Sequence, residues 1–508
     1  MSSSNFAKTS IYVTLIMVIG YALSFFKEAI VAYYFGVSSD VDAYTIAITI
    51  PVTLFAIVSV SIQSIVIPIY SDLLYNKGVD ESRKYISNLI TIVSIFSLGI
   101  IVLSELLASP LISIFAPGFS KEVHDLAVNL LRICMPTVLF AVLDRVFIGV
   151  LNVHKSFIFP SFGVYLLNIG LIVSIIALHS HFGITAACIG QVLGSILQIA
   201  FLIIVSRKYY HYSFVFDYKD ESLKKSLKQS VPIIWSISIG EVCAITNRLV
   251  ASMLFVGSIA ALGYASKINT VMMQFFTAAI STIVYPLYAE SSAKNELGKL
   301  NSRINSTLSV YSFFLIPLMC GLWCFRSEVV EIAFARGAFD KNAVDVTKDI
   351  LGIYSIGLIF MSIRDVVTKV FYSVNDTKTP SINATIGMIL NIVLNVTLPF
   401  IWGVNGLAIA TTVTAIIISS RLIYQLSKKN EFIELTFFFK NLGKIILASL
   451  VMFVVVLVIN KFLFFNNMIL RLLVGTILGA IVYFVLVLML KVPIMKNIIQ
   501  MLFKKSKK

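Results

Sequence analysis

Long apolar runs alternate with short polar connectors along nearly the whole chain. An α-helix needs about 20 mostly apolar residues to cross the hydrocarbon core of a bilayer. Fourteen runs reach that length, at roughly residues 10–34, 43–69, 86–112, 123–151, 158–178, 183–206, 230–256, 259–288, 305–325, 345–372, 380–401, 404–426, 441–460 and 468–490. The pattern predicts an all-α polytopic membrane protein with fourteen transmembrane helices.

The composition excludes a soluble globular protein. Hydrophobic residues make up 58% of the chain and charged residues 13%, whereas soluble domains contain about 45–50% apolar and about 25% charged residues. Only Lys8 precedes the first apolar run, which reaches spanning length. We therefore expect that run to be a retained transmembrane helix rather than a cleaved signal peptide.

The net charge of +15 is explained by topology rather than by a nucleic-acid partner. With the amino terminus inside, the predicted cytoplasmic ends and loops hold 26 of the 40 lysines and arginines, and the outer loops hold six. This asymmetry follows the positive-inside rule. We expect both termini in the cytoplasm, contacts with anionic membrane lipids and no nucleic-acid partner.

The chain contains an internal repeat of about 220 residues. Four landmark pairs are separated by 218 to 220 residues, namely Pro68 and Pro286, Gly118 and Gly337, Pro160 and Pro380, and Gly183 and Gly403. Each repeat holds six predicted spans, an even number, so both enter the membrane in the same orientation, as in transporters built from parallel repeats. We predict a six-helix lobe over residues 1–215, a second over 216–430, and two added helices with a basic cytoplasmic tail over 431–508.

Several charges lie inside or beside the predicted spans, where each costs at least about 2.5–3.5 kcal/mol and therefore faces a cavity or a partner. Lys27 and Glu28 occupy the first span, and Lys267 occupies the eighth. Two lysines converging on one cavity would suit an anionic substrate, because lysine acts as a point charge for phosphate. The alternative is that the two lysines are neutralised by Glu28 and Glu241.

For some other polar residues in the spans, a structural role is an alternative to substrate binding. Asp42 either lines the cavity or caps the second span. Arg248 lies on the seventh span with Glu241, and we count Arg248 and Glu28 with the substrate-binding candidates. Asp144 and Arg145 lie near the inner end of the fourth span, and we interpret them as interfacial anchors. Gln198 is expected to hydrogen-bond between helices.

The combination of motifs resembles the lipid II flippase (MurJ/MviN) family, part of the MOP exporter superfamily that also contains MATE drug exporters and polysaccharide flippases. The motifs are Lys27-Glu28-Ala29 with Phe35-Gly36, Ala116-Pro117-Gly118-Phe119, Gly263-Tyr264-Ala265-Ser266-Lys267, Arg336-Gly337-Ala338-Phe339-Asp340 and Asp376-Thr377-Lys378-Thr379-Pro380. The resemblance covers essentially all fourteen spans. It implies an alternating-access flippase of the bacterial plasma membrane, active in peptidoglycan synthesis, that moves an undecaprenyl-pyrophosphate-linked precursor, lipid II, from the inner to the outer leaflet. Lys27 and Lys267 match cavity positions that are usually arginine, and Asp42 matches an acidic position.

The same resemblance implies a sodium site. Some family members bind Na⁺, a possible coupling ion, between the seventh, eleventh and twelfth spans, and the matching residues are Asn247, Asn391, Asn395, Leu407 and Thr411. Asn391 and Asn395 are four residues apart, as are Leu407 and Thr411, so each pair shares a helix face. Interhelical hydrogen bonding is the alternative role of these residues.

Three other functions remain open at this point. The chain could flip another polyprenyl-linked oligosaccharide, or it could be a cation-coupled MATE-type drug antiporter, although Lys27 is unsuited to organic cations. A membrane scaffold would not require paired intramembrane lysines. Since no constellation of His, Cys or carboxylates suits catalysis, we expect no enzymatic activity and no organic cofactor. We also expect a monomer.

Overall fold

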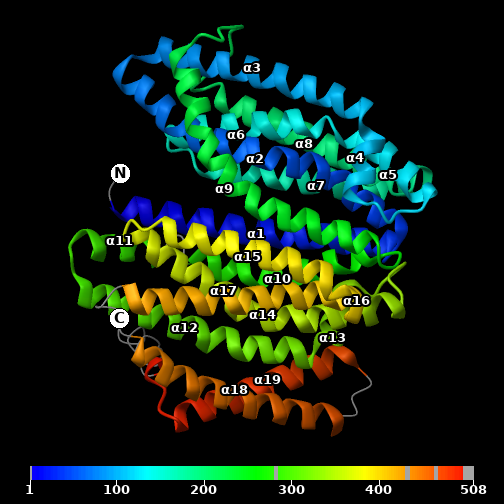
Figure 1. Cartoon of the computed structure of the whole chain (residues 1–508), viewed down its shortest axis with the longest axis vertical. Helices are drawn as coiled ribbons and strands as arrows, with labels where there is room; N and C mark the ends of the chain where they lie inside the picture. Colours follow the sequence, from blue (N-terminus) through cyan, green and yellow to red (C-terminus); the bar gives the residue numbers. More distant parts are fainter. Residues whose placement is uncertain (1–2, 280–283, 430–434, 463–466, 496–508) are drawn as a thin grey trace. The chain divides into compact units, whose positions relative to one another are not determined.

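The protein is built of α-helices joined by short connectors (Figure 1). The structure, a computed structural model, describes residues 3–279, 284–429, 435–462 and 467–495, and these residues form no β-strand. The helices are α1 (Ser3–Phe35), α2 (Ser39–Asn76), α3 (Val79–Leu106), α4 (Ala108–Phe115), α5 (Lys121–Cys134), α6 (Thr137–Val153), α7 (Ile158–Phe182), α8 (Thr185–Ser206), α9 (Glu221–Ser252), α10 (Ser258–Ala279), α11 (Tyr285–Ala293), α12 (Leu297–Cys324), α13 (Arg326–Phe334), α14 (Lys341–Ser373), α15 (Lys378–Thr397), α16 (Pro399–Trp402), α17 (Val404–Lys429), α18 (Thr436–Phe462) and α19 (Met468–Met489). The predicted all-α membrane fold is confirmed.

Most predicted spans coincide with helices, although 86–112 is divided between α3 and α4, and 380–401 between α15 and α16. Eleven segments of the described chain are long and apolar enough to cross a membrane. The other three predicted spans, 43–69, 230–256 and 259–288, coincide with α2, α9 and α10, although the last of these spans includes residues 280–283, which lie outside the described ranges. The span predicted at 123–151 is divided into α5 and α6 beside Pro136, because proline lacks the N–H that would continue the backbone ladder.

The chain forms two compact units. The first comprises Met1–Ala260 together with Gly337–Phe339, and the second comprises Ala261–Arg336 together with Asp340–Lys508. This division differs from the 215/216 boundary drawn from the repeat, because α9 packs against α2 in the first unit. The two repeat-based six-helix lobes remain a prediction.

In the first unit, α2 packs against α5, α6 and α9, and α7 packs along α8. The α7–α8 contact depends on small residues, since a Cβ at Gly170 would lie 2.6 Å from Gly194 Cα. Such close backbone approach replaces the hydrophobic driving force that is missing between helices in lipid. The pair therefore forms a rigid wall of this unit.

The polar linker after α8 is folded onto α3. Asn88 on α3 donates to the Asp217 carbonyl at 2.7 Å and accepts from the Asp217 N–H at 2.8 Å. The hydroxyls of Ser87 and Tyr210 are 2.8 Å apart. These buried polar pairs hold the linker to the helix, so it is an ordered part of the first unit.

In the second unit, α14 packs against α12 and α17, and α12 also packs against α18. The two added helices α18 and α19 lie side by side next to α12 (Figure 1). Their inner faces join the unit's core through Met452, Val456, Tyr483 and Val487. The Tyr483 hydroxyl donates to the Phe313 carbonyl of α12 at 2.7 Å. These helices are therefore an integral part of the second unit.

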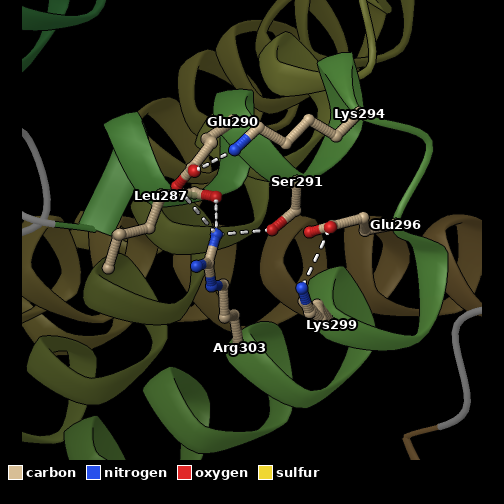
Figure 2. A network of polar contacts seen from close by, with 7 residues as sticks. All are labelled: Leu287, Glu290, Ser291, Lys294, Glu296, Lys299 and Arg303. Atoms are coloured by element: carbon tan, nitrogen blue, oxygen red, sulfur yellow. Dashed lines mark hydrogen bonds and ion pairs between the residues drawn. The ribbon is translucent and has the colours of Figure 1, made fainter.

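A polar network closes the turn between α11 and α12 (Figure 2). Arg303 on α12 donates to the Leu287 carbonyl and to the Ser291 hydroxyl of α11. Glu290 accepts from Lys294 at 2.7 Å, and this hydrogen bond, with the charge of Lys294, lowers the pKa of the Glu290 carboxyl. The network connects the short helix α11 to the spanning helix α12.

The local backbone repeats at the spacing seen in the sequence. Helix α7 begins at Ile158 and α15 at Lys378, which is 220 residues later. Lys155 and Asn375, the left-handed residues before these helices, both have φ of 59°. Gly183 and Gly403 have φ of 53° and 54°. The duplication therefore extends to backbone conformation at individual turns.

Candidate functional site

Lys27 and Glu28 form an ion pair within α1. Their Nζ and Oε1 atoms are 2.9 Å apart, and their side chains are 16% and 25% exposed. The two charges offset each other where water is scarce, which makes both tolerable inside a membrane helix. Neutralisation by Glu28, the alternative raised for Lys27, is thus observed. The pair still leaves Lys27 two of its three N–H donors for other acceptors.

Asp42 holds the beginning of α10 rather than the beginning of its own helix. Its carboxylate accepts from the Gly257 N–H at 2.7 Å and from the Ala260 N–H at 2.8 Å, and the residue is 4% exposed. Ser38 is the residue that caps α2, by accepting from the Val41 N–H. Asp42 therefore does not cap the second span, and a carboxylate instead meets the positive end of another helix. Its role toward substrate remains a prediction.

Turns that are distant in sequence make close contacts in the first unit. The Ala338 N–H donates to the Tyr33 carbonyl at 2.8 Å. Gly337 has φ of 62°, and a Cβ there would lie 2.2 Å from the Tyr33 oxygen. On the other repeat-related pair of turns, the Gly118 N–H donates to the Ser252 hydroxyl at 3.3 Å. The turn motifs of the sequence therefore meet each other in reciprocal pairs.

The remaining substrate candidates are divided between the two units. Arg248 lies on α9 in the first unit, where the negative charge of Glu241, two turns earlier on the same helix, acts on it. Lys267 lies partly buried on α10 in the second unit. Convergence of Lys27 and Lys267 on one cavity remains a prediction.

Asn391 and Asn395, together with Leu407 and Thr411 in the second unit, form an asparagine set with features of a cation site. Asn395 donates through Nδ2 to Asn391 Oδ1 at 2.9 Å, while its own Oδ1 is buried with no partner among the described residues. Thr411 donates to the Leu407 carbonyl at 3.1 Å, which leaves lone pairs on the hydroxyl oxygen. Asn247, which also has a buried oxygen without a described partner, belongs to the first unit. The donor set therefore fits a hard cation that prefers oxygen ligands, and Na⁺ binding remains a prediction.

The interpretation of Asp144 as an interfacial anchor is wrong. Asp144 is 6% exposed, and its Oδ1 accepts from Gln198 Nε2 of α8 at 2.7 Å. The predicted interhelical role of Gln198 is confirmed. One sequence signal could have pointed to a buried partner on α6. Two glutamines, Gln191 and Gln198, lie two turns apart on the otherwise apolar helix α8.

An apolar cavity of about 410 Å³ lies in the second unit. It is lined mainly by α12, α18 and α19, with Phe313, Pro317, Leu472 and Gly479 among its lining residues. The two added helices therefore provide walls of this cavity.

Comparison with known proteins places these features in one family. The chain matches the family described as lipid II flippase MurJ over residues 31–478. It is 29% identical over 468 residues to the lipid II flippase MurJ of Thermosipho africanus, which covers 91% of this chain and 93% of that protein. It is 27% identical over 482 residues to the probable lipid II flippase MurJ of Thermotoga maritima, which covers 93% and 94%.

Solved structures agree with this relationship. The structure titled lipid II flippase MurJ in an inward closed conformation matches with a TM-score of 0.82 and 28% identity, over 94% of this chain and 98% of that one. An inward-facing multidrug resistance MATE transporter of the MOP superfamily matches with a TM-score of 0.63 and 14% identity, over 83% and 100%. The MATE likeness is one of fold alone. With a family match that spans most of its length, this chain belongs to the lipid II flippase MurJ family.

Proposed function

We propose that this protein is a flippase that moves lipid II, the undecaprenyl-pyrophosphate-linked peptidoglycan precursor, from the inner to the outer leaflet of the bacterial plasma membrane. The observation that carries the proposal is similarity along 91% of the chain to a protein named as a lipid II flippase. Family membership also confirms the prediction of a transport protein rather than an enzyme. A MATE-type drug antiporter is not favoured, because the MATE relatives share only the fold.

The diphosphate would bind through the amine of Lys27. In the ion pair, Glu28 lies 2.9 Å from that amine, so an incoming diphosphate competes with a single carboxylate for the same positive charge. A diphosphate carries more negative charge than a carboxylate, and charge-assisted hydrogen bonds strengthen accordingly. Glu28 thus keeps Lys27 in place between transport cycles, and Lys267 and Arg248 would supply further cationic contacts.

Asp42 would hold the outer side shut while the substrate binds from inside. Its two backbone hydrogen bonds connect the start of α2 with the start of α10. Moving a lipid headgroup to the outer leaflet requires the outer ends of the helices to separate, as in alternating access. Release of these two hydrogen bonds would accompany outward opening.

The polyprenyl chain would occupy apolar surface, because its transfer through a polar path is unfavourable. The cavity lined by α12, α18 and α19 is an apolar space of the second unit that could hold it. We further infer that the protein acts as a monomer with both termini in the cytoplasm, and that Na⁺ bound by Asn247, Asn391, Asn395, Leu407 and Thr411 serves as a coupling ion.

Rescue of a bacterium depleted of its own lipid II flippase tests the proposal. The wild-type chain should restore growth, and Lys27→Ala and Lys267→Ala should each abolish rescue at normal protein levels, because the diphosphate loses a counter-charge. Lys27→Arg should retain rescue. The matched control is Lys299→Ala, which removes a lysine that is 66% exposed in the α11–α12 region and should leave growth unchanged.

The outcomes separate the alternatives. No rescue by a stably expressed wild-type chain would favour another polyprenyl-linked oligosaccharide as substrate. Full rescue by both alanine variants would contradict the role given to the two lysines.

A further inference from the structure

A second cavity lies within the first unit, and none of its lining residues belongs to the asparagine set. It has a volume of about 370 Å³ and is lined by α2, α6, α7 and α8. Its polar lining comes mostly from two helices, with Thr137, Asp144 and Arg145 on α6 and Gln191, Ser195 and Gln198 on α8. All of these residues belong to one compact unit, so the geometry is internal to it. We propose that this cavity binds a monovalent metal cation, Na⁺ or K⁺, through Asp144.

The carboxylate of Asp144 supplies a negative charge that its neighbours satisfy only in part. Gln198, an uncharged donor, makes the one hydrogen bond to it among the described residues, at 2.7 Å. Arg145 Nε lies 3.7 Å from Asp144 Oδ2, which is beyond hydrogen-bond length. An ionised carboxylate offers about four acceptor sites. Most of its acceptor capacity therefore remains available on a residue that is 6% exposed.

The other polar groups present oxygen acceptors rather than protons to the cavity. Thr137 donates its hydroxyl proton to the Cys134 carbonyl at 2.6 Å, and Ser195 donates its own to the Gln191 carbonyl at 2.8 Å. Both hydroxyl oxygens keep their lone pairs. Gln198 uses its amide nitrogen on Asp144, which leaves its carbonyl oxygen as an acceptor. Oxygen ligands around one carboxylate are the environment that hard cations prefer.

Charge and size favour a monovalent ion. A divalent site would be expected to gather several acidic or imidazole ligands, and no group of three or more His, Cys, Asp or Glu residues occurs in the described part of the chain. A water molecule takes about 30 Å³ in the liquid, so the cavity has room for an ion that keeps part of its hydration shell. An anion would face the Asp144 carboxylate and be repelled.

Arg145 gives the proposal a directional test. Its side chain is 39% exposed, so it sits at the edge of the cavity, where its positive charge opposes a bound cation. Removing that charge should strengthen cation binding, whereas a purely structural Asp144–Arg145 pair would simply be weakened. The inference does not depend on lipid II being the substrate.

The experiment is binding of radioactive ²²Na⁺ to the purified full-length chain in detergent, with competition by KCl and with choline chloride holding the ionic strength constant. All variants carry Asn395→Leu, which removes a ligand of the expected sodium site in the second unit. In that background, Asp144→Asn should weaken binding by about tenfold or more, and Arg145→Gln should strengthen it by a similar factor. Asp125→Asn, on an aspartate that is 63% exposed, is the matched control and should bind as the background does.

Size-exclusion profiles establish that each variant is folded. If Asp144→Asn does not fold, Gln198→Met, which removes one oxygen ligand and keeps the side-chain length, takes its place and should also weaken binding. Unchanged ²²Na⁺ binding by a folded Asp144→Asn or Gln198→Met variant would overturn the proposal. So would weaker binding by Arg145→Gln, or the absence of saturable ²²Na⁺ binding in the Asn395→Leu background.

Discussion

At the scale of single residues, backbone groups are partners in the contacts around the start of α10 and around Gly337. Asp42 accepts two N–H groups at the start of α10, and the Tyr33 carbonyl accepts the Ala338 N–H. The free N–H groups at a helix start have no partner within their own helix. One aspartate on a neighbouring helix therefore decides whether that helix begins where it does.

Replacing Asp42 by Asn should destabilise the protein by about 1–3 kcal/mol, because the amide loses one of two backbone hydrogen bonds and the negative charge at the helix start. Thermal unfolding in detergent measures the change. Asp40→Asn is the control, since Asp40 lies exposed in the first turn of α2 and should have little effect. Equal stabilities of the two variants would show that the Asp42 contacts contribute nothing.

Gly337→Ala should destabilise the protein by more than about 1 kcal/mol, because φ of 62° is unfavourable for alanine and its Cβ would lie 2.2 Å from the Tyr33 oxygen. The control is Gly298→Ala in the first turn of α12, where a Cβ meets nothing within 4 Å. That substitution should be neutral or stabilising, since alanine favours helix. If both variants unfold at the same temperature, the close contact at Gly337 is not significant.

At the scale of elements, α19 is attached to the second unit by a charge pair as well as by its apolar face. Arg471 Nη2 lies 2.5 Å from Glu328 Oε1 of α13, and the Glu328 side chain is 7% exposed. Breaking such a pair leaves a buried charge without its partner, which is more harmful than losing the attraction itself. This contact fixes one wall of the apolar cavity.

Arg471→Ala should therefore lower the free energy of unfolding by about 2 kcal/mol. Adding Glu328→Gln should recover part of that loss, because the buried charge is removed together with its counter-ion. A double-mutant cycle of unfolding midpoints measures the coupling. Additive effects of the two substitutions would contradict a direct interaction.

At the scale of the whole molecule, the duplication and the charge asymmetry together predict the topology. Six spans in each repeat and two added ones make an even number, so both ends of the chain should lie on the same side. A fluorescent protein fused after Lys508 should fluoresce, and alkaline phosphatase fused in the turn after Phe115 should be active, because the first folds in the cytoplasm and the second outside it. The reversed pattern would show that the positive-inside reading is wrong for this chain.

Much of the fold was predictable because each helix had to be apolar over a length set by the bilayer. The run at 158–178 became the single helix α7, whereas its repeat at 380–401 is divided into α15 and the short α16 beside Pro399. The break between α5 and α6 was not predicted, since hydropathy continues across Pro136. The candidate site was harder, because a sequence gives the register of Lys27 or Asp144 on a helix but not the residue that faces it.

Hydropathy and the 220-residue spacing by themselves determined that this is a helical membrane protein with an internal repeat, and they predict that the two repeats have the same orientation. The sequence can predict these properties because each segment's own residues show whether it is apolar enough to lie in lipid. Tertiary structure alone decided that Asp42 holds α10 and that Asp144 is buried against Gln198 beside a cavity. Such roles depend on which atoms of distant segments lie within about 3 Å of one another, and packing rather than pattern sets those distances.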